Sequence, residues 1–464
     1  MAQAVSARAG ARSGGERLRG PPAAAGRVTG RVPPGGVRIQ MSGADVAPGR
    51  EFWIVAAGCS KESKGEEAKK EKESLLADLK SSRALTDACR IGSRPAPWQF
   101  DVPDGDSSLK HGSFDDLNML ADNLPKYDSQ VDSIVHRLER QIIELNSAHP
   151  EGKSPAQIQF KVKSQRQEKG VLDYISNWKW DEAKYPTKRL MTDTCQSLMT
   201  AVNRLDDEAR SMTNKYNELK TQKANIDRKE GALLTGADLI DVLTPKVVKM
   251  GAGTSADNDF IYSEYLTTVT VILTKGAEVE FLKTYETLTD SVVPKSAKRF
   301  DHDSLKDKDG NTIWRVVLFK DCAEPFKKAC RERRYITRDF EYSEDAYNNR
   351  EAARKELEGK IRREYDLIMS LYQAAWSDVM VAWIHIKAMR VFAESALWSG
   401  LPPKFAAFIV SPLPGKGDAV RKVLANKLGK LGGGTGPGSK ADLDEGEENY
   451  PYVSLSFAPF TVPR

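Results

Sequence analysis

The clearest hydrophobic pattern in the chain lies between Pro186 and Pro245, where 58 residues contain no proline. Apolar residues recur there at alternating spacings of four and three, the repeat of one face of an α-helix. Lys223 interrupts this series, whose apolar members are Leu198, Val202, Leu205, Ala209, Met212, Tyr216, Leu219 and Ile226. The spacing predicts one long helix over about 188–230.

A second long helical pattern lies within residues 326–401, a stretch that again contains no proline. Its apolar members are Leu357, Ile361, Tyr365, Ile368, Tyr372, Ala375, Val379, Trp383, Ile386 and Ala393. An apolar stripe this long needs a partner along its length, so we expect this helix to pack antiparallel against the helix over 188–230. A shorter amphipathic helix is predicted from Tyr127 to Asn146. The lysine- and glutamate-rich residues 61–73 predict an exposed helix.

Between the two long helices the pattern changes to that of β-strands. Residues 265–273 (YLTTVTVIL) and 312–319 (TIWRVVLF) are rich in β-branched and aromatic residues, and residues 335–342 (YITRDFEY) alternate. Predicted helices at 279–288 and 324–332 complete a small α/β insert. Strands are also predicted at 51–57 and 450–457. We expect these two to pair and so to join the two ends of the folded region.

The predicted fold class is therefore α+β and predominantly α, with an elongated helical body made from both chain ends and a small α/β body inserted between long helices. The expected divisions are a disordered extension at 1–45, the first part of the helical body at 46–214, the α/β insert with its connecting helices at 215–345, and the second part of the helical body at 346–464. Residues 430–449, glycine-rich and then acidic, predict a flexible loop.

Composition narrows the class of protein. The chain has 464 residues, of which 40% are hydrophobic and 29% charged, so we expect more than one hydrophobic core. No run of eighteen apolar residues occurs, and we therefore expect no membrane span. Five scattered cysteines indicate reduced thiols in a cytosolic compartment, because a disulfide framework needs more of them at closer spacing.

Positive charge is concentrated at the N-terminus. The first fifty residues hold eight arginines and two acidic residues, which accounts for more than the whole formal net charge of +5. The remainder is close to neutral, so we expect no nucleic acid among its partners. The Arg/Gly/Pro-rich extension is interpreted as disordered, or as an over-long gene model whose true start is Met41. Its arginines also suit an organelle transit peptide, but its glycines and prolines oppose the amphipathic helix that such a peptide needs.

The motifs of catalysis and cofactor binding are incomplete. Gly152-Lys153-Ser154 matches the second half of a phosphate-binding P-loop, but position 147 is serine where the motif needs glycine. Residues 251–256 imitate a dinucleotide fingerprint, yet two aspartates follow where a phosphate would lie. The five histidines lack metal-ligand spacing. His385 is interpreted as a hydrogen-bonded histidine on a packed helix, with a buried proton carrier as the alternative. We therefore predict no catalytic, cofactor-binding or metal-binding residues.

One cluster of charge remains as a candidate for partner binding. Arg331, Arg333, Arg334 and Arg338 lie together beside the third predicted strand of the insert. Such a cluster could contact an acidic partner, or it could be a solvated face. Both interpretations stay open.

Several segments, taken in order, resemble the family of C subunits of the V-type proton ATPase. They are residues 51–54 (EFWI), 178–186 (WKWDEAKYP), 263–266 (SEYL), 285–288 (YETL), 292–294 (VVP), 338–342 (RDFEY), 382–392 (AWIHIKAMRVF), 400–402 (GLP) and 450–453 (YPYV). The resemblance extends from about residue 50 to the C-terminus. The N-terminal extension and the loop at 430–449 depart from the family pattern.

The resemblance implies a non-catalytic stator subunit without a cofactor, with a "foot" built from both chain ends and an inserted α/β "head". The implied partners are the peripheral-stalk subunits of E and G type and the cytosolic N-terminal domain of the large a-type membrane subunit, with actin as an additional candidate. Membrane association through the complex alone is implied, as is a place in the cytoplasm on the cytosolic face of acidic organelles. Reversible assembly of the two sectors of the pump is also implied. The main alternative is a generic elongated coiled-coil scaffold.

Overall fold

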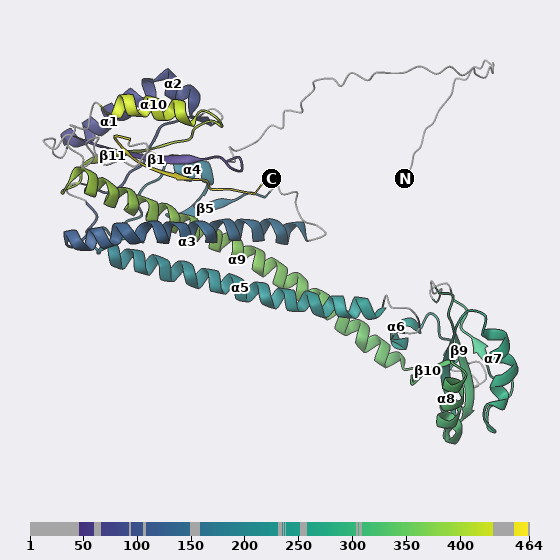
Figure 1. Ribbon diagram of the computed structural model, residues 1–464. Helices are drawn as coiled ribbons and strands as arrows, with labels where there is room; N and C mark the ends of the chain where they lie inside the picture. The colour runs from purple at the N-terminus through teal and green to yellow at the C-terminus, as the bar shows by residue number, and fades with distance from the viewer. Residues whose placement is uncertain are drawn as a thin grey trace, which may run out of the picture. The chain divides into compact units, whose positions relative to one another are not determined.

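The computed structural model describes residues 46–59, 66–91, 94–104, 108–148, 158–230, 234, 236, 238–250, 258–302, 305, 309–429 and 450–462. The predicted extension at 1–45 and the predicted loop at 430–449 lie outside these ranges. Within them the structure contains both long helices and small antiparallel sheets (Figure 1). This confirms a mixed α+β fold that is mainly helical.

The first sheet joins the two ends of the described chain. Its strand order is β12 (Val453–Phe457), β1 (Phe52–Gly58), β11 (Phe405–Val410) and β4 (Trp98–Gln99), all antiparallel. Ile54 lies opposite Leu455, which confirms the predicted pairing of the first and last strands. Strand β11 was not predicted, although its sequence FAAFIV is a short apolar run that prolines flank on both sides.

Both faces of the first sheet are buried. On one side, Trp53, Val55 and Ala57 pack under α1 (Glu66–Ser81), α2 (Arg83–Ala88) and α10 (Gly417–Leu428). On the other side, Phe52, Ile54 and Ala56 join the core that contains the long helices. Burial on both faces explains why β1 is uniformly apolar instead of alternating.

Three long helices form the largest core: α3 (Phe114–Ser147), α5 (Met191–Glu230) and α9 (Glu344–Ser399). Three contacts show that α5 and α9 are antiparallel, because the partner number on α9 falls as the number on α5 rises. They join Cys195 to Met389, Thr213 to Tyr372 and Lys223 to Glu358. The predicted pairing of the two long helices is therefore confirmed. Helix α9 also packs against α3.

Helix α3 begins earlier than the sequence pattern indicated. A capping box starts it, in which the Ser113 hydroxyl accepts from the Asp116 backbone N–H and the Asp116 carboxylate accepts from the Ser113 backbone N–H. The predicted helix began at Tyr127, two residues after Pro125. The helix instead continues through Pro125, and its apolar face before that residue (Leu117, Leu120 and Leu124) is buried.

Short elements connect the long ones. Strands β2 (Arg90–Ile91) and β3 (Arg94–Pro95) form one hairpin, and β5 (Lys161–Ser164) and β6 (Gln167–Gly170) form another. The tight turn of the second hairpin places Gln165 and Arg166 at positive φ values of 49° and 64°. Helix α4 (Val171–Ser176) follows β6, and α6 (Leu239–Val242) follows α5 along the chain.

The second sheet lies within the predicted insert. Its order is β10 (Ile336–Arg338), β7 (Leu266–Leu273), β9 (Thr312–Phe319) and β8 (Lys298–Arg299). Helix α7 (Glu278–Thr284), the 3-10 turns η3 (Tyr285–Thr287) and η5 (Lys320–Cys322), and α8 (Ala323–Glu332) accompany it. One face has a core around Phe281, Trp314 and Phe326, and the other a core around Phe260, Phe300 and Tyr342.

The third strand of the insert is shorter than predicted. Alternation over residues 335–342 predicted eight strand residues, but pairing with β7 stops at Arg338. Beyond that point side chains hold the segment: the Tyr342 backbone N–H donates to the Tyr262 hydroxyl at 3.0 Å, and Asp339 pairs with Lys327. These contacts take the place of ladder hydrogen bonds and end the strand.

The division of the chain into a foot and a head, with the boundaries given above, stays a prediction. Among the described residues, α9 is long and apolar enough to cross a membrane by length and composition, but a core helix meets the same criteria. Here 61% of its apolar window is buried inside the fold. The apolar character of α9 is thus explained by packing, and the expected absence of a membrane span stays a prediction.

Candidate functional site

The four candidate arginines do not form one cluster. Arg331 lies in the last turn of α8, Arg333 caps that helix, and Arg334 adopts the left-handed conformation that turns the chain into β10. All three of these side chains are exposed. Arg338 lies opposite Thr270, and Ile336, on the same face of β10, packs in the core opposite to the one that α8 covers. The structure therefore separates Arg338 from the other three.

Three exposed arginines lie at the C-terminal end of α8 and in the turn that follows it. We call Arg331, Arg333 and Arg334 the α8 basic end. Positive charge at a helix C-terminus is favourable because it opposes the negative end of the helix dipole. One arginine would be enough to oppose the helix dipole. The remaining positive charge suits the carboxylates of an acidic partner surface.

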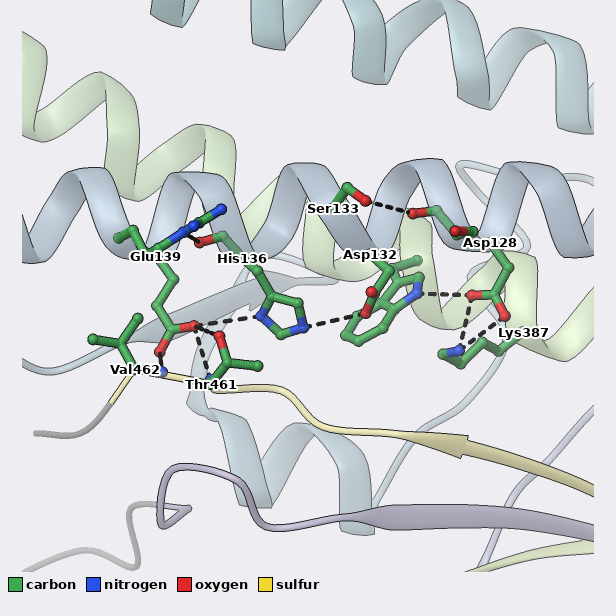
Figure 2. Close-up of polar contacts among 11 residues, drawn as sticks. Asp128, Asp132, Ser133, His136, Glu139, Lys387, Thr461 and Val462 are labelled. Carbon is green, nitrogen blue, oxygen red and sulfur yellow. Dashed lines mark hydrogen bonds and ion pairs between the residues drawn. The ribbon is translucent and has the colours of Figure 1, made fainter.

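A buried ionic contact joins α3 to α9. The Lys387 ammonium lies 2.8 Å and 3.0 Å from the two carboxylate oxygens of Asp128, and the Trp383 indole N–H donates to Asp128 at 2.8 Å (Figure 2). Arg390 Nη1 also lies 3.1 Å from Asp128 Oδ2. Burial lowers the pKa of Lys387, while the charge of Asp128 opposes that shift. This contact fixes the register between the two helices.

The sequence carried a signal for this contact that the prediction did not use. Asp128 lies between Leu124 and Val131 on the apolar stripe of α3, at a position where the helical repeat requires an apolar residue. A charged residue on a buried stripe needs a partner of opposite charge. Lys387, within an otherwise apolar stretch of α9, carried the same signal.

Further along α3, Glu139 holds the C-terminal segment. Its side chain is fully buried and accepts hydrogen bonds from the Thr461 backbone N–H at 3.0 Å and the Val462 backbone N–H at 3.4 Å (Figure 2). His136 lies between this carboxylate and that of Asp132, at 3.4 Å and 3.2 Å. Burial lowers the pKa of His136, but hydrogen bonds and charges from Asp132 and Glu139 outweigh burial and raise it to about 9.

Aromatic contacts support the same segment. Phe460 stacks on Trp376 of α9 with ring centroids 5.5 Å apart, and Phe160 meets both rings edge-on. The Phe460 carbonyl accepts from the Gly49 backbone N–H at 2.8 Å. We call residues 457–462, together with the groups of α3 and α9 that hold them, the terminal clamp. It ties the beginning and the end of the described chain to the helical core.

His385 is a packed, neutral histidine. Its Nδ1 lies 2.7 Å from the Val381 carbonyl, and its Nε2 accepts from the Asp181 backbone N–H at 3.2 Å. The rings of Trp178, Trp180 and Tyr185 surround it. Burial lowers its pKa to about 4. Both ring nitrogens are engaged in holding α9 and the 178–185 segment together, which supports the structural interpretation over a proton carrier.

One cavity in the described part of the chain is lined largely by charged side chains. A cavity of about 340 Å³ lies beside α9 and is lined by Tyr347, Arg350 and Arg354 among others. Its arginines already form ion pairs, Arg350 with Asp238 and Asp241 and Arg354 with Asp227. The described part of the chain has no group of three His, Cys, Asp or Glu side chains placed to hold a metal.

Comparison with known proteins covers most of the chain. The family model for the V-ATPase C subunit matches residues 52–455. The C subunit of the V-type proton ATPase of Caenorhabditis elegans is 31% identical over 374 residues, which is 78% of this chain and 89% of the relative. The C subunit of the V-type proton ATPase of Dictyostelium discoideum is 29% identical over 358 residues, which is 77% of this chain and 88% of the relative. The C 1 subunit of the V-type proton ATPase of Rattus norvegicus is 27% identical over 411 residues, which is 87% of this chain and 96% of the relative.

Proposed function

Because the chain belongs to the family of V-ATPase C subunits, we propose that it is the stator subunit that bridges the peripheral stalks and the membrane sector of the pump. The C subunit is a non-catalytic part of a proton-transporting complex, and it belongs to the peripheral V1 sector on the cytosolic side. The bridging role, the E-, G- and a-type subunits as partners, and a place on acidic organelles are parts of the proposal.

One observation carries the proposal: the family match begins at the first strand of the first sheet and ends within its last strand, with the insert between them. The matched region thus contains two sheets with separate hydrophobic cores, connected by α5 and α9. Two separately folded surfaces allow two separate contacts. A rotary motor transmits torque when its stator is held against rotation, and two modest contacts together hold far better than one, through effective concentration.

The terminal clamp and the Asp128–Lys387 contact support a mechanical role for the helical core. A stator needs a stiff connection, and buried ionic contacts between helices resist sliding because any shift leaves a buried charge without its partner. Reversible assembly also fits a subunit held by two modest partner contacts. When one contact is released, the other loses the effective concentration that strengthened it, so both are released together.

Copurification tests the proposal. A tagged full chain and a tagged version beginning at Met41 are recovered from a detergent extract of the cells that express them, and copurifying proteins are identified by mass spectrometry. We expect stalk subunits of E and G type and the large membrane subunit with both versions. A reproducible set of unrelated partners would overturn the proposal and favour the coiled-coil scaffold. Recovery of actin would support the additional partner.

A charge variant identifies the surface involved. We expect neutralisation of the α8 basic end, as R331Q/R333Q/R334Q, to reduce recovery of the stalk subunits by about tenfold or more, because acidic partners lose their counter-charges. The matched control neutralises three exposed lysines elsewhere in the insert, as K275Q/K283Q/K320Q. Equal loss in both variants would show a general charge effect and would remove the α8 basic end from the proposal.

A further inference from the structure

The pair formed by α5 and α9 extends beyond the end of α3. Helix α3 packs against both of them: the Gln130 side-chain amide donates to the Asn203 side chain of α5 at 3.0 Å, and α3 also lies against α9. It ends at Ser147, whereas α5 continues to Glu230. Past the end of α3, α5 and α9 therefore still contact each other, but α3 no longer covers the groove between them.

A cavity of about 480 Å³ lies at this point. Ala148, which caps the C-terminal end of α3, borders it. The apolar side chains that line it from the two long helices are Tyr216, Ala224, Ile361 and Tyr365. On α5 the lining extends from Tyr216 to Asp227, which is about 16 Å or three turns of helix. The cavity thus continues the groove in which α3 lies, and its length is that of a short helix.

The acidic side chains of the lining are already paired. Lys223, the residue that interrupts the apolar series of α5, has its ammonium 2.8 Å from the Glu358 carboxylate of α9. Asp227 lies 3.6 Å from Arg354. Because each carboxylate has a cation beside it, the pair leaves little negative potential to repel an acidic ligand.

Positive charge remains at the edge of the cavity. Lys220 forms no ion pair within the described part of the chain, and its ammonium lies 5.5 Å from the centroid of the Tyr216 ring. Arg362 lines the cavity from the α9 side, and both basic side chains are exposed. The cavity therefore combines an apolar floor with a cation on each helix. This combination suits a ligand that is apolar on one face and acidic beside that face.

We propose that this cavity binds an amphipathic helix of a partner protein, whose apolar face is flanked by acidic residues. Helices α5 and α9 already hold one helix in this way, because α3 packs in the same core up to Ser147. A helix in an apolar groove is held by side chains spaced at i, i+3 or i+4, and i+7, and three turns of lining offer a contact to each. Its carboxylates lie near Lys220 and Arg362, whereas a basic helix is repelled. The surface is separate from the α8 basic end and does not depend on the proposed stator role.

Binding of a helical peptide to the purified full chain tests the cavity. The probe is a fluorescein-labelled peptide of about four turns, with leucine at i, i+3, i+7 and i+10 and with glutamate on both sides of this stripe. A second peptide has lysine in place of each glutamate. We expect saturable binding of the acidic peptide by fluorescence anisotropy, and at least tenfold weaker binding of the basic one. Equal affinities, or no saturable binding of the acidic peptide, would overturn the proposal.

Two variants locate the binding surface. Ala224→Trp fills the cavity, and Lys220→Glu reverses the charge at its edge. The matched controls are Ala352→Trp on α9 and Lys215→Glu on α5, which lie outside the lining. All four positions are exposed, so we expect the fold to be retained. Each cavity variant should weaken binding of the acidic peptide by tenfold or more, and each control should leave it unchanged. Equal effects in variants and controls would show that the peptide binds elsewhere.

Residues 149–157 follow Ala148 in the chain and provide the alternative occupant. They are replaced by a glycine-serine linker of equal length, and the affinity for the acidic peptide is measured again. We expect the affinity to stay the same. A rise of tenfold or more would overturn the proposal, because it would show that this segment of the chain itself competes for the cavity.

Discussion

Asp128 of α3 and Lys387 of α9 form an ion pair at 2.8 Å in which the two side chains are 8% and 4% exposed. The two residues are 259 positions apart in the chain. Their contact joins the first and second parts of the matched region across the centre of the largest core. Loss of the Asp128 carboxylate is the more damaging change, because it leaves the buried Lys387 ammonium without its paired carboxylate, whereas Asp128 also has Arg390 at 3.1 Å.

Removal of the Asp128 carboxylate should therefore destabilise the protein strongly. We expect Asp128→Ala to lower the free energy of unfolding by about 3–5 kcal/mol, measured by urea denaturation. The double variant D128L/K387M should recover most of this loss, because apolar side chains of similar size replace both charges. Asp378→Ala removes an exposed ion pair with Lys184 and is the control, with an expected change below about 1 kcal/mol. A similar small change for Asp128→Ala would contradict the importance of the buried pair.

His136 should make the protein less stable in alkali. Its pKa is about 9 in the folded protein and about 6.5 in an unfolded chain. The folded state thus holds the proton more tightly, and this stabilisation is complete below pH 6.5 and is lost as pH rises through 9. We expect the free energy of unfolding to fall by up to about 3 kcal/mol over that window. Urea denaturation at several pH values measures this fall. His136→Gln should flatten this slope, whereas His302→Gln, an exposed histidine, should leave it unchanged.

His385 should make the protein less stable in acid. Burial lowers its folded pKa to about 4, so between pH 6.5 and 4 the unfolded chain binds a proton that the folded protein does not. The free energy of unfolding should therefore fall as pH falls through this window. Direct observation of the His385 ring by NMR should show it neutral at pH 5. A ring that titrates near pH 6.5 would contradict the buried, hydrogen-bonded environment.

Glu139 should be necessary for attachment of the C-terminal segment. We expect Glu139→Ala to lower the free energy of unfolding by about 2–4 kcal/mol, because the backbone N–H groups of Thr461 and Val462 lose a charged acceptor. The variant should also be trimmed faster by carboxypeptidase. Glu144→Ala, an exposed glutamate on the same helix, is the matched control. Equal trimming of both variants would show that the aromatic contacts of Phe460 hold the segment without Glu139.

The local patterns of the sequence were sufficient for most elements. The apolar repeat predicted α5 and α9, and the β-branched runs predicted β7 and β9, because these signals arise from residues a few positions apart that face one core. Where the local signal was incomplete, the bounds were wrong: the predicted helix missed the turns of α3 before Tyr127, and alternation overextended β10.

By itself the sequence determined the two long helices, the strands of the insert, the pairing of the first and last strands, and the resemblance to a family. The tertiary structure alone decided that β11 separates β1 from β4, that Asp128 meets Lys387, that Glu139 holds Thr461, and that Arg338 lies opposite Thr270, on the face of the insert sheet that α8 does not cover. The physical reason is separation along the chain. Periodicity reports which side of an element is buried, but the partner of a buried charge depends on which distant elements meet, and no local repeat encodes that meeting.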